Sequence, residues 1–308
     1  MLRIHFWISA SFAFVLLPSC ATPPTPVVAP PPAQIATDSP DLSPELPYSV
    51  PQEPLVFESG SDVGLQAPEI HAQSYILVNA NTGSVIAARH ADDPRAVAST
   101  QKLLTALIVA ESGNLDHLVR IQPEDVSVAP SKLGVRVGDT YTRRDLLIAF
   151  LVKSSNDVAA ALARDNAGSI PAFAARMNAR ARRAGATNSH FMNPHGLTAS
   201  GQHSTARDMA RIALAAHHNP IVSDAVRRKY YTFTFNHGGA AHLENTNELI
   251  GRMPECDGMK TGYTEPAGRC LVSSAHRGGR EVILVQLGTH TKYIFNDGAK
   301  LMEWGLNF

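Results

Sequence analysis

Residues 99–111 are the part of the chain that most constrains its fold. Their sequence, STQKLLTALIVAE, predicts a helix that is apolar on nearly every side. A helix of this kind belongs where other elements cover it all round. We therefore expect it in the middle of a domain, and Ser112-Gly113-Asn114 marks its end.

The other predicted elements place helices between two groups of strands. Residues 74–79 and 84–89 are predicted to form a hairpin around the turn sequence NANTG. Helices are expected at 142–150, 156–165, 169–185 and 205–219, with Thr142 and Thr205 capping the first and last. Strands are expected again at 230–235, 258–261, 270–275 and 282–288, followed by a helix at 293–304. This order predicts an α+β fold in two or three layers: an antiparallel sheet built from both chain ends, flanked by helices, with an inserted helical lobe.

The first twenty residues are predicted to be an export signal. Arg3 precedes an apolar run at residues 6–17, which is too short to span about 30 Å of hydrocarbon as a helix. The run ends in Leu17-Pro18-Ser19-Cys20, which resembles the lipobox of bacterial lipoproteins, where the cysteine is lipidated and begins the mature chain. Ordinary cleavage near Ala21 is the alternative. The protein is thus expected in the periplasm or cell envelope, with a possible lipid anchor at Cys20 as its only link to a membrane.

A linker and one folded domain are predicted to follow the signal. Residues 21–66 contain eleven of the 21 prolines, and their only charged side chains are carboxylates. Such sequence buries too little apolar area to offset the entropy of ordering, so a disordered linker is expected. Residues 67–308 are predicted to be the folded domain.

The composition excludes several classes of function. Lys+Arg and Asp+Glu both number 27, so the chain is not expected to bind nucleic acid. None of the three cysteines has zinc-ligand spacing, and neither a metal nor another cofactor is expected. Cys256 and Cys270 are predicted to be free thiols. If Gly262 pairs with Gly268 in a hairpin, Cys270 lies opposite Lys260 and too far from Cys256 for a disulfide.

Three short motifs carry the candidate chemistry. The first is Ser99-Thr100-Gln101-Lys102, where a spacing of three places Ser99 and Lys102 on one face of a helix start. A serine hydroxyl needs a base to become a nucleophile, and a buried, uncharged Lys102 is a candidate for that base. Alone, the motif is equally compatible with a capping serine and a solvated lysine.

The second motif is Ser154-Ser155-Asn156, in a break between two predicted helices. A hydroxyl and an amide at this place can relay a proton and hold a peptide carbonyl. A capping pair between helices is the simpler interpretation.

The third motif is Lys260-Thr261-Gly262 on a predicted strand, followed by Tyr263. Lysine and threonine on a strand can bind a carboxylate, and a glycine lets a ligand backbone lie close. The backbone N–H of Tyr263 is a candidate oxyanion donor. An exposed edge-strand lysine is the alternative.

The order S-x-x-K, S-x-N, K-T-G is typical of the penicillin-recognising serine enzymes. The flanking sequences resemble the low-molecular-mass D-alanyl-D-alanine carboxypeptidases, peptidase family S11, over about residues 70–308. The resemblance rests on SYILVNANTGSVIAARHADDPRAVASTQKLLTALIVA at 74–110, FMNPHGLTASGQHSTARDMA at 191–210 and DGMKTGYTEPAGRCLVSSA at 257–275.

This resemblance implies a mechanism on a peptidoglycan stem peptide ending in D-Ala-D-Ala. It implies that Ser99 attacks the carbonyl, Lys102 accepts the proton, and Ser154 passes it to the leaving D-alanine. It further implies that Asn156, Lys260, Thr261, Gly262 and Tyr263 bind the substrate, and that β-lactam antibiotics acylate the enzyme.

Three other functions fit parts of the same pattern. A DD-endopeptidase would use the same residues to cut cross-links. A β-lactamase is less favoured because no E-x-x-L-N-like acidic loop follows Ser154. An inactive wall-binding lipoprotein is disfavoured by the intact motifs.

Overall fold

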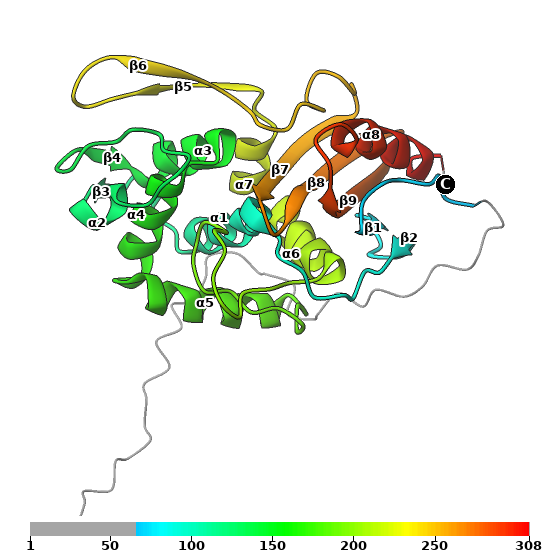
Figure 1. Ribbon diagram of the computed structural model, residues 1–308. Helices are drawn as coiled ribbons and strands as arrows, with labels where there is room; N and C mark the ends of the chain where they lie inside the picture. The colour runs from blue at the N-terminus through cyan, green and yellow to red at the C-terminus, as the bar shows by residue number, and fades with distance from the viewer. Residues whose placement is uncertain (1–65, 308) are drawn as a thin grey trace, which may run out of the picture. The chain divides into compact units, whose positions relative to one another are not determined.

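A computed structural model describes residues 66–307. The predicted signal peptide, Cys20 and nearly all of the predicted linker lie outside the described residues. The first strands of the described chain are joined to the last ones in one antiparallel sheet of five strands, in the order β2-β1-β9-β8-β7 (Figure 1). Its strands are β1 Ser74–Asn79, β2 Val85–Arg89, β7 Cys256–Thr264, β8 Gly268–Arg277 and β9 Arg280–Thr289. The predicted sheet from both chain ends is confirmed.

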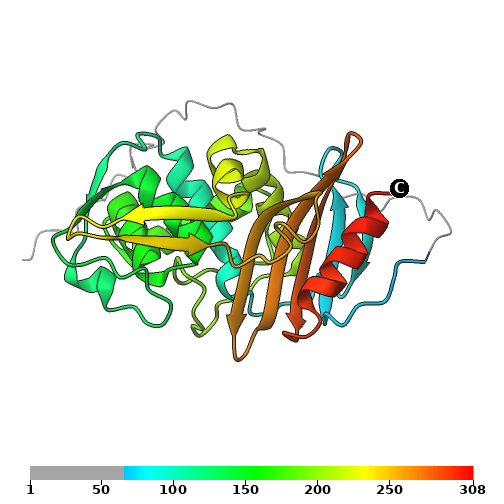
Figure 2. The same ribbon diagram turned by 90° about the horizontal axis from the view of Figure 1, so that it is seen from above.

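Alternate residues along each strand enter two different cores, because successive strand side chains point to opposite faces. On β1, Ile76 and Val78 belong to the larger core, whereas Tyr75 and Leu77 belong to a smaller one. The smaller core lies under α8 (Ile294–Gly305), which packs on β8 and β9. The larger core lies under α6 (Ala206–His218) on the opposite face (Figure 2). The fold therefore has three layers.

The inserted lobe is built around α1 (Lys102–Glu111), every residue of which is buried. A short 3-10 helix, η1 (Ala98–Gln101), leads into it. The other helices of this part of the chain are α2 Pro123–Val126, α3 Arg143–Lys153, α4 Asn156–Ala167, α5 Ile170–Arg183 and α7 Pro220–Val226. Because α3, α4, α5, α6 and α7 all contact α1, the prediction of a central, covered helix is confirmed.

Burying the whole of α1 requires partners for its charged residues. Glu111, at its end, forms an ion pair with Arg180 of α5 (Nη2–Oε1 2.7 Å), and both side chains are nearly inaccessible. The paired geometry compensates the loss of hydration that an isolated buried carboxylate would suffer. Lys102, at its start, forms no ion pair with a carboxylate of residues 66–307 and instead hydrogen-bonds to the groups described below.

Several short elements were not expected from the sequence. They are the helix α2, the strands β3 Leu118–Arg120 and β4 Thr140–Thr142, and β6 Ala240–Glu244, which pairs with β5 Tyr230–Thr234. The helix α7 was also missed, because Asn219-Pro220 was interpreted only as a stop. Asn219 Oδ1 instead accepts the N–H groups of Ile221 and Val222, and Pro220 opens the new helix.

The predicted register of the β7–β8 hairpin is wrong by two residues. Gly262 lies opposite Cys270, and Thr264, not Gly262, pairs with Gly268. A three-residue loop closes the hairpin, and Gly268 adopts the left-handed conformation there (φ +63°). Cys256 and Cys270 are nevertheless both free, as predicted.

Candidate active site

Ser99 and Lys102 meet where η1 passes into α1. Three residues make about one helical turn, so the two side chains lie on the same side. Lys102 Nζ donates hydrogen bonds to Ser99 Oγ (2.8 Å) and to Asn156 Oδ1 (2.6 Å). Ser99 Oγ in turn donates to the backbone carbonyl of His195 (3.3 Å). The amine and hydroxyl are thus in direct contact, a geometry that allows proton transfer between them.

The surroundings of Lys102 favour its uncharged form. The side chain has no exposed surface, and this burial holds the pKa of Lys102 well below its ordinary value. The positive charge of Lys260 lowers the pKa further, while Asp157 opposes the shift. Asp157 is itself occupied, since its carboxylate accepts the N–H groups of Leu133 and Gly134 at 3.0 Å. A neutral amine beside a hydroxyl can act as a general base.

The Ser154-Ser155-Asn156 segment links α3 to α4 and brings two of its three residues to the cavity. Ser154 is the C-cap residue of α3. It adopts a left-handed conformation (φ +65°) and lines the cavity. Asn156 accepts from Lys102 and donates to the carbonyl of Pro130 (2.7 Å). Ser155 is fully buried, and its Oγ has no hydrogen-bond partner among the described residues. The middle serine therefore does not enter the cavity.

The Lys260-Thr261-Gly262-Tyr263 segment lies on β7, at the edge of the sheet. Gly262 packs against η1 so closely that a Cβ there would lie 2.8 Å from the backbone nitrogen of Ser99. Lys260 is fully buried, its Nζ donates to the carbonyl of Thr261 (3.0 Å), and burial lowers its pKa to about 7. Thr261 Oγ1 bonds to Thr246 Oγ1 (2.6 Å), and Tyr263 is exposed.

A cavity of about 290 Å³ connects these three segments. Ser99, Ser154, Asn156, Thr261, Gly262 and Tyr263 all line it, so the structure brings these predicted residues together. Lys102 and Lys260 lie behind the lining, in contact with Ser99 and with the Thr261 backbone respectively. Predicted residues from three distant parts of the sequence therefore converge on one hydroxyl.

A strained backbone residue lies in or beside each of the three motifs. Ala98, next to Ser99, has φ +47°, and Met259, next to Lys260, has φ +95°. With Ser154, these are three of the six described non-glycine residues with positive φ, a conformation that costs about 1–3 kcal/mol each. Such strain persists only where the surrounding packing imposes it, and it is characteristic of sites that require a fixed geometry.

Some lining residues had no signal in the sequence. Pro130 and Ser131 come from the loop before β4, and Leu197 from the loop after His195. Gly196 (φ +85°) lies directly against η1, where a Cβ would be 2.0 Å from the carbonyl oxygen of Ala98, so only glycine fits this position. The backbone carbonyl of His195 accepts the Ser99 hydroxyl, so this loop borders the nucleophile candidate.

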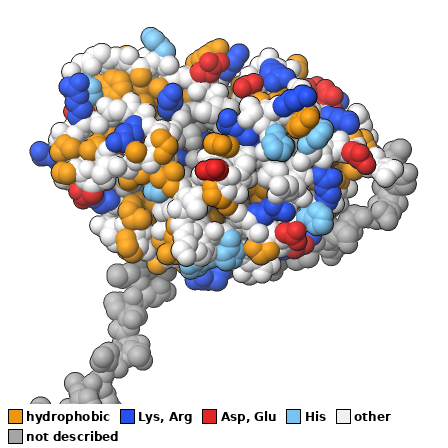
Figure 3. Space-filling view, viewed as in Figure 1, with side chains coloured by type: hydrophobic (Ala, Val, Ile, Leu, Met, Phe, Trp, Pro, Cys, Tyr) orange, Lys and Arg blue, Asp and Glu red, His pale blue; other side chains and the backbone are white. Residues whose placement is uncertain are grey.

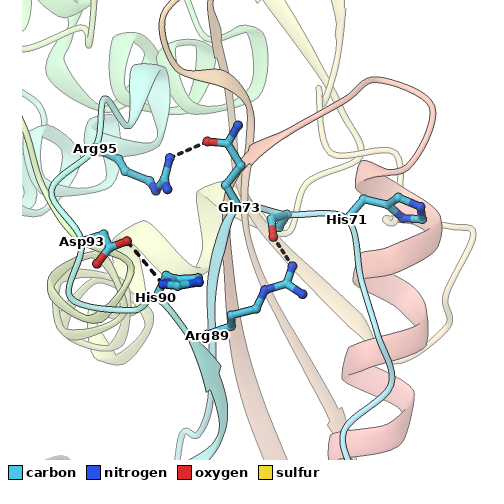
Figure 4. Close-up of a pocket in the computed structure, with 7 residues that line it drawn as sticks. His71, Gln73, Arg89, His90, Asp93 and Arg95 are labelled. Atoms are coloured by element: carbon cyan, nitrogen blue, oxygen red, sulfur yellow. Dashed lines mark hydrogen bonds and ion pairs between the residues drawn. The ribbon is translucent and has the colours of Figure 1, made fainter.

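A second hollow, at the start of β1, lacks these features (Figure 4). Its two arginines are already engaged: Arg89 donates to the carbonyls of Ile70 and Ala72, and Arg95 bonds to Ser74 and Gln73. It has neither a paired serine nor a buried amine. Within residues 66–307, no group of three or more His, Cys, Asp or Glu side chains is placed to hold a metal ion.

Comparison with known proteins identifies the family. The family model described as D-alanyl-D-alanine carboxypeptidase, peptidase S11, matches residues 62–291. The chain belongs to the peptidase S11 family. The resemblance found in the sequence is thereby confirmed, and the three motifs of the site lie within the S11 match.

Two curated relatives from Escherichia coli K12 carry different activities in their names. D-alanyl-D-alanine carboxypeptidase DacC is 35% identical over 257 residues, which cover 79% of this chain and 63% of DacC. A D-alanyl-D-alanine endopeptidase is 33% identical over 269 residues, covering 84% of this chain and 85% of that protein. The chain thus spans less than two thirds of the first relative's length and most of the second's.

Solved structures share the fold. A D-alanyl-D-alanine carboxypeptidase from Mycobacterium tuberculosis superposes with a TM-score of 0.76 at 32% identity, covering 80% of this chain and 95% of that one. The Streptomyces K15 DD-transpeptidase gives a TM-score of 0.75 at 31% identity, covering 79% and 100%. The predicted α+β fold, with a helix-flanked antiparallel sheet, is confirmed.

Proposed function

We propose that this S11 protein is a serine D-Ala-D-Ala carboxypeptidase that removes the terminal D-alanine from peptidoglycan stem peptides. One observation carries the proposal: Ser99 Oγ, in an open cavity, accepts a 2.8 Å hydrogen bond from an amine whose burial favours its neutral form. This pair supplies a nucleophile and its base without any cofactor.

In the proposed reaction, Ser99 Oγ attacks the carbonyl between the two D-alanines while Lys102 Nζ takes the hydroxyl proton. The backbone N–H groups of Ser99 and Tyr263 hold the oxyanion. Ser154 passes the proton to the leaving amine, and the released D-alanine leaves an acyl-enzyme ester on Ser99. Water then hydrolyses that ester and restores the free hydroxyl.

The substrate is held by the remaining residues of the cavity. Lys260 and Thr261 bind the terminal carboxylate, for which a buried cation and a hydroxyl are suited. Asn156 holds the substrate amide, and Gly262 allows the peptide backbone to approach β7. A β-lactam, which presents a strained amide and a carboxylate, would be accepted at the same positions and remain as an ester on Ser99.

The test is hydrolysis of a peptide ending in D-Ala-D-Ala, with release of free D-alanine as the readout. The full chain should release it, and the Ser99→Ala variant should not. A matched peptide ending in L-Ala-L-Ala should stay intact. Folded protein that leaves the D-Ala-D-Ala peptide uncleaved would contradict the proposal.

An endopeptidase activity is the second candidate. It is favoured by the relative named D-alanyl-D-alanine endopeptidase, because the match with this chain covers 85% of that relative's length. It would use the same residues on a cross-linked peptide. Digestion of purified sacculi separates the two: free D-alanine indicates the carboxypeptidase, and monomers formed from dimers indicate the endopeptidase.

We also propose that the chain is exported and lipidated at Cys20, as the lipobox-like sequence indicates, with residues 67–308 as the folded domain. Mass spectrometry of the N-terminus of the mature protein tests this lipidation.

Neither nucleic acid nor a metal has a role in the proposal. Figure 3 shows basic and acidic side chains interspersed over one face of the molecule. No helix within residues 66–307 is both long and apolar enough to cross a membrane.

A further inference from the structure

The cavity beside Ser99 continues around the edge strand β7 toward the start of α8. Its far part is lined by Thr261, Tyr263, Arg269, Thr291, Ile294 and Phe295. Alternate residues of β7 face opposite sides of the sheet, so Gly262 meets Ser99 while Tyr263 faces the α8 side. The proposed reaction uses Thr261 and the backbone N–H of Tyr263, but it gives no role to the side chains of Arg269, Thr291, Ile294 and Phe295.

Arg269 is the cation of the far part, and its position is fixed by two neighbours. It lies directly opposite Tyr263 in the β7–β8 hairpin, with its guanidinium 4.5 Å from the Tyr263 ring centroid. Its Nε donates to Thr291 Oγ1 (3.0 Å). No carboxylate within residues 66–307 forms an ion pair with Arg269. A guanidinium held in this way is preorganised to bind an anion.

The cavity lining contains one carboxylate, Glu248, and it already has a partner. Its Oε2 lies 3.4 Å from Arg252 Nη1, and both side chains are largely exposed. Ile294 and Phe295 contribute apolar surface to the same lining. The far part therefore suits a side chain with an aliphatic stem and an anionic end.

The proposed function fixes the direction in which a substrate would cross this region. Its terminal carboxylate lies at Lys260 and Thr261, and its scissile carbonyl lies at the N–H of Tyr263. The peptide therefore runs antiparallel to β7 along the free edge of the sheet, as an added strand. The residue that precedes the two D-alanines then passes Tyr263, beside Arg269.

We propose that Arg269 is a specificity-determining residue that binds a carboxylate on the side chain of the substrate residue preceding D-Ala-D-Ala. This inference rests on the proposed function. It selects diaminopimelate, whose side chain ends in both an amine and a carboxylate, over lysine, which has the amine alone. Thr291 and Tyr263 are positioning residues for the guanidinium.

The experiment compares two peptides that differ only in that residue, diaminopimelate or lysine, before D-Ala-D-Ala. Wild type should have a kcat/KM about tenfold higher for the diaminopimelate peptide, the size of one partly exposed charge-assisted contact. Arg269→Ala should bring the ratio of the two kcat/KM values to about one. Arg269→Lys, which keeps the charge, should retain part of the preference, and Thr291→Val should reduce it.

The matched control is Arg280→Ala, an exposed arginine at the opposite end of the neighbouring strand β9, which should keep the wild-type ratio. Acylation by penicillin, followed in parallel, reports whether each variant is folded and competent. If wild type is acylated and cleaves both peptides equally well, or if Arg269→Ala keeps the ratio, this inference is wrong although the proposed function stands. If wild type neither cleaves a peptide nor is acylated, the proposed function itself fails.

Discussion

Lys102 Nζ lies 2.8 Å from Ser99 Oγ, and the lysine side chain that carries it has no exposed surface. This contact joins the two requirements of a serine nucleophile, a hydroxyl and a nearby base that is not already protonated. Burial, reinforced by the charge of Lys260, favours the neutral amine. The proposed reaction depends on this pair.

Replacing the proposed base should slow acylation while leaving the fold in place. Lys102→Met keeps the length of the side chain but cannot accept a proton, and should lower the acylation rate by about 10²–10⁴-fold. Stopped-flow measurements with a fluorescent penicillin give the rate, and circular dichroism checks the fold. Lys300→Met, at an exposed lysine of α8, is the control and should react like wild type. Rapid acylation of a folded Lys102→Met protein would show that another group takes the proton.

The pKa of Lys260, about 7 because of its burial, predicts an alkaline limit to substrate capture. The carboxylate binds the protonated amine, so kcat/KM should fall as the pH rises above about 7. A bound carboxylate raises the pKa of Lys260 again, so kcat should fall only at higher pH. In Lys260→Gln, activity should be low and the alkaline fall absent. A kcat/KM for wild type that still rises between pH 8 and pH 10 would contradict the assigned role.

The same pKa predicts how stability depends on pH. Unfolding returns Lys260 to its ordinary pKa of 10.5, so between about pH 7 and 10.5 the unfolded chain binds more protons than the folded one. The contribution of Lys260 to the free energy of unfolding should therefore rise with pH through that window. Urea titrations of wild type and Lys260→Gln at several pH values isolate this contribution. A wild type that loses stability relative to the variant as the pH rises would contradict the prediction.

A methyl group at Gly262 should reduce turnover without unfolding the protein. The new Cβ would lie 2.8 Å from Ser99 N and 3.1 Å from Thr100 N, so β7 and η1 must move apart. A shift of about 1 Å at a reacting centre can cost roughly 100-fold in rate. Steady-state kinetics of Gly262→Ala measure the loss. Gly278→Ala is the comparison: its Cβ meets nothing within 4 Å, so it tests whether backbone strain alone, at a glycine with φ +57°, slows turnover. Wild-type rates in Gly262→Ala would show that the close approach is dispensable.

Removing the hydroxyl of Ser155 should stabilise the protein. This Oγ is fully buried without a hydrogen-bond partner, which costs about 1–3 kcal/mol in desolvation. Ser155→Ala should raise Tm by about 2–4 °C, the shift expected for about 1 kcal/mol in a domain of this size. Penicillin acylation should stay at the wild-type rate, because Ser155 is not part of the cavity lining. A lower Tm would indicate that the hydroxyl has a partner in solution.

The sequence predicts the parts of the site that depend on local spacing. A serine and a lysine three residues apart at a helix start must lie on one face, so the Ser99–Lys102 contact follows from the spacing. That Asn156 and Gly262 approach Ser99 does not follow from spacing, because these residues are 57 and 163 positions further along the chain. Only the resemblance to S11 enzymes implied that convergence.

The features that the sequence did not predict depend on turn chemistry and tertiary packing. The β7–β8 register was wrong by two residues because the pairing depends on the three-residue loop before Gly268. Pro130 and Ser131 lie in an irregular loop that gives no periodic signal, and the loop is held by Asp157 through backbone contacts. Arg269 is an unremarkable arginine in sequence and acquires its place in the cavity only from the strand pairing.

The mass of the intact protein after exposure to benzylpenicillin tests the central claim most directly. Wild type should gain the mass of one penicillin, and peptide mapping should place it on Ser99. Ser99→Ala, folded to the same extent, should gain nothing. A folded wild type without the adduct, or an equal adduct on Ser99→Ala, would contradict the assignment of Ser99 as the nucleophile.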